Sequence, residues 1–67
     1  MYVIARTDAG TGAPFDWLLE FSLKGDQIRV TRTRQNARHF KSEKDAYAVL
    51  DLLLRMDGSY NWRVMQV

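Results

Sequence analysis

The most regular pattern in the chain is the alternation of apolar and polar side chains over residues 17–24. Side chains of a strand point alternately to opposite faces, so this pattern predicts a strand with one buried face. The large apolar residues predicted to face the core are Trp17, Leu19, Phe21 and Leu23. A register slip of one residue would expose all of them, so the chain must fold around a sheet that is covered on this side.

A helix is predicted to follow Ser42, whose side-chain oxygen can cap the first turn. Glu43 and Asp45 lie in that turn, where the helix dipole favours negative charge. Apolar residues then recur at helical spacing and form the predicted buried stripe: Ala46, Val49, Leu50, Leu53 and Leu54. Gly58 is the predicted C-cap that ends the helix.

Strand and turn residues surround these two elements. Residues 2–5 and 60–67 predict the first and last strands, and residues 7–16 predict a glycine-containing loop. A tight hairpin turn is predicted at residues 24–27, where Gly25 supplies a positive φ.

The third strand is predicted to begin with Ile28 and Val30 pointing inward. The next inward positions are occupied by Arg32 and Arg34, and two unpaired arginines are not stable in an apolar core. The strand is therefore expected to end, bulge or leave the core there. Irregular chain is predicted from about Arg34 to Lys41.

The resulting order is β-β-β-α-β in a single domain spanning residues 1–67. This order predicts an α+β fold in which one helix packs on one face of a four-stranded, mainly antiparallel sheet. Trp62 and Val64 of the last strand are expected to point inward. That strand is expected to run parallel to an odd-numbered neighbour, because the helix returns the chain to the end where such a strand begins.

The sheet face away from the helix is predicted to stay uncovered. Its residues would be Leu18, Ser22, Arg29, Thr31, Thr33, Arg63, Met65 and Val67, with either Val3 and Ala5 or Tyr2 and Ile4. An exposed apolar surface of this kind is typical of an interface, including that of a homodimer. The alternative is an ordinary half-solvated antiparallel face. The absence of cysteine excludes disulfides, which leaves oligomerisation as the support that small domains often use.

Positive charge is concentrated in one third of the chain. Residues 24–44 contain seven lysines and arginines against two acids, a net charge of +5 within a chain of net charge +2. The planar fork of arginine suits carboxylates and phosphates, so this segment is the candidate partner-binding site. The candidate residues are Arg29, Arg32, Arg34, Arg38 and Lys41, together with Arg63 and Met65 on the open face.

Residues suited to catalysis are scarce. His39 is the only histidine, and no carboxylate motif accompanies it to form a metal site. Gly10-Thr11-Gly12 lacks the following helix that a phosphate-binding loop requires. The chain is therefore expected to be no enzyme and to use no metal or cofactor. It has neither a signal-peptide pattern nor an apolar run of about 20 residues, so a cytoplasmic protein without membrane contact is expected.

The second half of the chain carries the pattern Ala37-x-x-Phe40-x-Ser42-x-x-Asp45-Ala46, followed by Leu50, Leu53 and Trp62-x-Val64. Over residues 37–67 it resembles small uncharacterised proteins of bacteriophages and mobile elements, among which anti-CRISPR inhibitors are prominent. The resemblance implies a non-enzymatic inhibitor that occupies a surface of a larger host protein or nucleoprotein complex. The alternative is a small basic protein that contacts nucleic-acid phosphates through residues 24–44.

Overall fold

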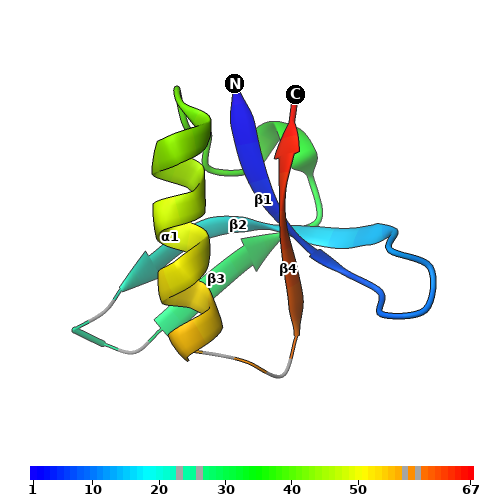
Figure 1. Cartoon of the computed structure of the whole chain (residues 1–67), viewed down its shortest axis with the longest axis horizontal. Coiled ribbons are helices and arrows are strands. Elements are labelled where there is room, and N and C mark those ends of the chain that lie inside the picture. The colour runs from blue at the N-terminus through cyan, green and yellow to red at the C-terminus, as the bar shows by residue number, and fades with distance from the viewer. Residues whose placement is uncertain (23, 26, 57, 59) are drawn as a thin grey trace.

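The computed structural model describes residues 1–22, 24–25, 27–56, 58 and 60–67. Its elements in chain order are β1 (Tyr2–Thr7), β2 (Pro14–Ser22), β3 (Gln27–Thr31), the 3-10 helix η1 (Arg34–Asn36), α1 (Glu43–Met56) and β4 (Asn61–Gln66). The strands form one sheet in the order β3-β2-β1-β4, and all neighbours are antiparallel. One helix, α1, packs against β4 and β1 (Figure 1). The predicted α+β class, sheet and element order are confirmed.

β4 lies beside β1 and runs antiparallel to it along its whole length. The prediction that the last strand runs parallel to an odd-numbered neighbour is therefore wrong. The reason is that residues 32–42, rather than the helix, return the chain to the starting end of β1 (Figure 1). α1 then leads to the opposite end, and β4 comes back beside β1.

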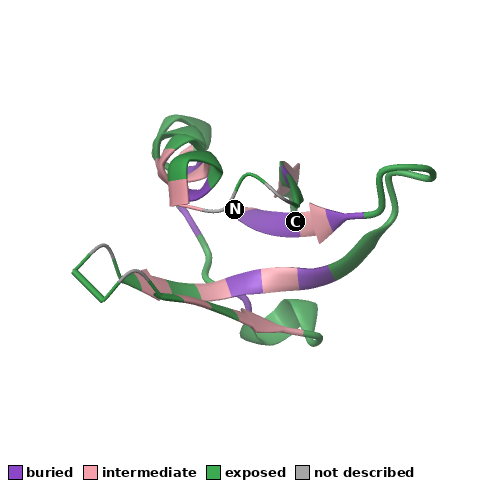
Figure 2. Cartoon of the chain, turned by 90° about the horizontal axis from the view of Figure 1, so that it is seen from below, coloured by how far each residue is buried: buried purple, intermediate pink, exposed green. Residues whose placement is uncertain are grey.

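β1 pairs with β2 only over its second half, from Ala5↔Trp17 to Thr7↔Pro14. Figure 2 shows the two strands separating as they run away from the loop that joins them. The second half of β2 pairs with β3 instead. The sheet is therefore open between β1 and β2 at the end where β1 begins.

Residues 37–40 occupy this opening. The amide of Arg38 donates a 2.9 Å hydrogen bond to the carbonyl of Leu18, and Tyr2 and Phe40 exchange two backbone bonds of 2.9 and 2.8 Å. Figure 2 shows the connection passing from η1, on one side of the sheet, to α1 on the other. A segment predicted to be irregular thus satisfies backbone groups that the diverging strands leave unpaired.

A β-bulge changes the alternation of β2 in the middle of the strand. Leu18 is paired with Val30, but the next pair joins Glu20 to Arg29, so Leu19 is the extra residue. Before the bulge, Leu18 points to the core and is completely buried. The prediction that Trp17 and Leu19 face the core is therefore wrong, because the bulge inverts the pattern between Leu18 and Phe21. Leu23 lies outside the described residues.

The core lies between α1 and the sheet. Its buried members are Ile4, Leu18, Phe40, Ala46, Leu53 and Trp62. The other side chains packed against them are half-buried: Tyr2, Phe21, Ile28, Val30, Val49, Leu50 and Val64. The inward positions predicted for Phe21, Ile28, Val30, Trp62 and Val64 are confirmed. β3 ends at Thr31, immediately before Arg32. This agrees with the prediction that the strand cannot continue with Arg32 and Arg34 pointing into the core.

The helix begins as predicted. The Ser42 side-chain oxygen accepts a 3.1 Å hydrogen bond from the amide of Asp45, which caps the first turn. Leu54 was predicted to be buried but is 46 % exposed, because α1 covers only one half of the sheet and leaves this side of the helix open. The helix ends at Met56, and residues 57 and 59, which flank the predicted C-cap Gly58, lie outside the described residues. No described helix is long and apolar enough to cross a membrane.

Two loops join the first three strands. In residues 8–13, the Asp8 carboxylate accepts hydrogen bonds from the amides of Gly10 and Thr11, which identifies a side-chain-capped hairpin loop. The left-handed backbone in this loop lies at Gly12, with φ of 73°. Gly25, for which a positive φ was predicted, does not have one. Residues 23 and 26 of the second turn lie outside the described residues.

The sheet face away from α1 is predicted to stay uncovered, but in the structure parts of it are covered. Val3 and Ala5 lie on this face and are completely buried. η1 and its flanking residues lie on this side of the sheet and contact β2 (Figure 2). The prediction that nothing remained to cover this face is wrong, because the connection to the helix crosses it. A homodimer formed through this face stays a prediction. The face has less exposed apolar surface for a second copy to bury than the sequence predicts.

The bulge yields a direct prediction. Leu18→Ala is expected to lower the free energy of unfolding by about 3 kcal/mol, because it opens a cavity in the core. Leu19→Ala removes the same atoms from a half-buried side chain and is expected to cost about 1 kcal/mol. Urea denaturation followed by circular dichroism measures both variants. Equal losses, or a larger loss for Leu19→Ala, would contradict the bulged register.

Candidate partner-binding site

The residues from Arg32 to Lys41 form a continuous stretch of positive charge, which we call the basic connection. It contains four cations and no acid: Arg32, Arg34, Arg38 and Lys41. All four are exposed, and none forms an ion pair with any residue that the structure describes. Four of the predicted site residues thus lie exposed on one segment, and their charges are available to a partner.

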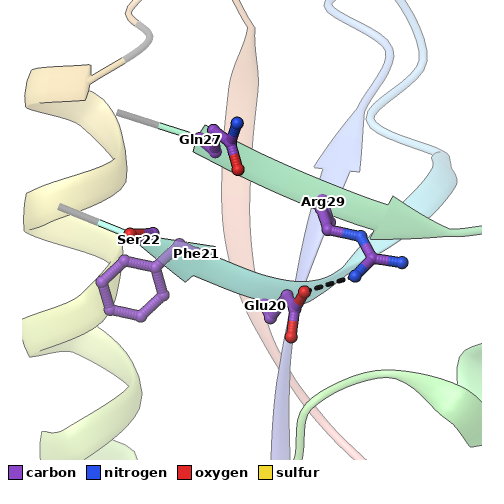
Figure 3. Close-up of a pocket in the computed structure, with 5 residues that line it drawn as sticks. All are labelled: Glu20, Phe21, Ser22, Gln27 and Arg29. Carbon is purple, nitrogen blue, oxygen red and sulfur yellow. Dashed lines mark hydrogen bonds and ion pairs between the residues drawn. The ribbon is translucent and has the colours of Figure 1, made fainter. Parts of the chain in front are cut away.

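Arg29 lies in β3 and is committed to a contact within the chain. Its guanidinium forms a 2.5 Å ion pair with Glu20 on the neighbouring strand. Together with Phe21 they border a depression of about 190 Å³ (Figure 3). Sites that enclose a drug-sized ligand measure roughly 300–1,000 Å³, so this depression is too small for one. Since Glu20 offsets its charge, Arg29 contributes less to the positive surface than the sequence indicated.

Arg63 and Met65 lie on β4, the edge strand opposite to β3. Their partners across the β1–β4 pair are Ala5 and Val3, so they belong to the face away from α1. Arg63 is exposed, whereas Met65 is half-buried. The sheet order therefore separates these two predicted residues from Arg29 by two strands.

Arg38 is held differently from the other cations of the basic connection. Its guanidinium carbon lies 5.7 Å from the ring centre of Phe21 and 5.5 Å from that of Phe40. Both distances are within the range of a cation–π interaction. The backbone of Arg38 is also fixed, through the hydrogen bond to Leu18. An exposed arginine is thus restricted in both its main chain and its side chain.

A second arginine is surrounded by aromatic rings at the other end of β1. The Arg6 guanidinium lies 5.2 Å from the ring centre of Phe15, 4.4 Å from that of Tyr60 and 5.8 Å from that of Trp62. Its nitrogens bind both carboxylate oxygens of Asp16. The side-chain hydrogen bond to Asp16 raises the pKa of Arg6, so the guanidinium stays charged.

Arg6, Asp16 and the three rings form a group that we call the Arg6 cluster, and the sequence did not predict it. The sequence predicts Asp16 at the end of a glycine-containing loop, but it lies in β2 and is only 5 % exposed. No local signal pairs residues 6 and 16, because their contact depends on the register of β1 and β2. The cluster stabilises the fold, and it leaves Phe15 and Tyr60 nearly half-exposed at its outer side.

Comparisons with known proteins add no functional assignment. No protein-family model, curated protein or solved structure matches this chain. The resemblance of residues 37–67 to phage-encoded proteins therefore stays a prediction. Within the described part of the chain, no three side chains among histidine, aspartate and glutamate are grouped to hold a metal ion.

The Arg6 cluster yields a stability prediction. Asp16→Ala leaves a largely buried guanidinium without its counter-ion, and we expect a loss of about 3 kcal/mol in the free energy of unfolding. The matched control is Asp51→Ala, which breaks the exposed ion pair with Arg55 on α1. That change is expected to cost less than about 0.5 kcal/mol. Similar urea midpoints for the two variants would show that the Arg6–Asp16 pair contributes no more than a surface pair.

Proposed function

We propose that this chain is a non-enzymatic binding protein that occupies an acidic surface of a partner protein through its basic connection. The observation that carries the proposal is the exposure of Arg32, Arg34, Arg38 and Lys41 on one segment without an acid between them. Opposite charges on two surfaces accelerate association and set its specificity. The proposal needs no enclosed substrate cleft.

The partner's class follows from the aromatic residues. Proteins that bind single-stranded nucleic acids stack bases on exposed aromatic rings and combine this with positive charge. Phe40, the phenylalanine of the basic connection, is only 7 % exposed and belongs to the core. Its ring is therefore not available to a base. This favours an acidic protein surface, with nucleic-acid phosphates as the competing outcome.

The resemblance over residues 37–67 suggests the biological setting. We propose an inhibitor of the type encoded by phages, acting in the host cytoplasm on a host defence complex. Small inhibitors of this kind work by covering a functional surface of a larger assembly. The backbone hydrogen bonds of Arg38 and Phe40 fix this part of the basic connection, and a segment fixed before binding loses less entropy when it binds.

The test is capture of partners by the immobilised chain from a bacterial lysate, with and without nuclease treatment. We expect a defined protein to be retained, and to be lost with Arg32→Glu/Arg34→Glu, because these reversals place acids in the basic connection. The control is Lys24→Glu/Lys44→Glu, which changes the net charge equally at exposed residues outside it. The control is expected to retain the partner.

Three results would contradict this proposal. Equal loss with both double variants would mean that the total charge, and not the basic connection, determines binding. Retention of the partner by Arg32→Glu/Arg34→Glu would place the contact elsewhere. Recovery that disappears after nuclease treatment would identify nucleic acid as the partner.

A further inference from the structure

Arg6 shows how this chain binds a carboxylate with an arginine. Aromatic rings contact the Arg6 guanidinium, which leaves its N–H groups to form two hydrogen bonds with Asp16. The Nε atom of Arg6 lies 2.7 Å from one carboxylate oxygen. The planar fork of arginine matches the two oxygens of a carboxylate, and a restrained fork loses little entropy when it binds.

Arg38 has the aromatic contacts of this arrangement but no carboxylate bound to it among the described residues. Phe21 and Phe40 contact its guanidinium at 5.7 and 5.5 Å, distances similar to those around Arg6. No side chain in the described ranges accepts a hydrogen bond from the Arg38 guanidinium. Arg38 is exposed, whereas the Arg6 side chain is only 18 % exposed. Its N–H groups are therefore open to an acceptor from outside the chain.

We infer that Arg38 is the specificity-determining residue of the basic connection and binds one carboxylate of the partner, from an aspartate, a glutamate or a chain terminus. The inference rests on the proposed function and names the group that the partner supplies. Arg32 and Arg34 differ from Arg38 in that no described aromatic ring contacts their guanidinium groups. Arg32 and Arg34 contribute positive charge alone, whereas the guanidinium of Arg38 is also held in one orientation by the two rings.

The experiment compares two substitutions that both keep the charge. The probe is a capped peptide of six glutamates, titrated at low salt and followed by ¹H–¹⁵N NMR. The backbone amide signals of the basic connection give the affinity of every variant, and contact with Arg38 itself is followed by its Nε–H signal. The signal is identified by its absence in Arg38→Lys. We expect a saturable shift of this signal. Arg38→Lys is expected to weaken binding about fivefold or more, because lysine lacks the planar fork, and Arg32→Lys less than about twofold.

A third variant tests the role of the rings. Phe21→Leu keeps an apolar side chain at a half-buried position but removes one ring beneath Arg38. We expect it to weaken peptide binding about threefold while its NMR spectrum remains that of the folded chain, because the guanidinium is less restricted. Unchanged affinity in folded Phe21→Leu would overturn the part of the inference that concerns positioning.

The outcomes separate this inference from the proposed function. Equal losses for Arg38→Lys and Arg32→Lys, with the peptide still bound, would overturn the role of Arg38 and leave an acidic partner in place. A thymidine oligonucleotide of equal charge is titrated in parallel. If the oligonucleotide alone shifts the Arg38 signal, the carboxylate assignment fails and the proposed protein partner fails with it. No saturable shift with either probe would also overturn the inference.

Discussion

The fold depends on the insertion of residues 37–40 between β1 and β2. These strands diverge after three paired positions of β1, and backbone groups at the opening would otherwise lose their partners. Arg38 and Phe40 supply those partners from the middle of the chain, through Leu18 and Tyr2. The same insertion places the Phe40 ring in the core and begins the path to α1. A connection that lies outside the four strands therefore completes the backbone hydrogen bonding where the sheet opens.

Much of the fold could be predicted from local patterns. The Ser42 cap and the apolar stripe of α1 are local, and both predict the helix correctly except at Leu54. The face of β2 could not be predicted, because the bulge at Leu19 depends on pairing with β3 and leaves no distinctive residue such as glycine. Whether β4 runs parallel or antiparallel to β1 depends on the path of residues 32–42. The alternation of apolar and polar side chains does not predict that path.

The composition of the candidate site could be predicted from the sequence, but its geometry could not. The cations of the basic connection follow from the sequence, since no acid lies among them. The different environments of Arg29 and Arg38 arise from tertiary contacts: Glu20 faces the first, and Phe21 lies beneath the second. Phe21 comes from another strand, and its position follows the bulge that the alternation does not reveal. The charges of these residues can thus be read from the sequence, whereas the environment of each guanidinium depends on the fold.

The position of β1 in the sheet has a consequence for synthesis on the ribosome. β1 is translated before every other element described, yet it pairs along its full length only with β4, which is translated last. The Tyr2–Phe40 bridge likewise waits for the middle of the chain. Domains fold during translation only when the segments that pair have left the exit tunnel. The sheet of this chain therefore closes after β4 emerges, and until then Val3 and Ile4, which are completely buried in the folded chain, stay exposed to solvent.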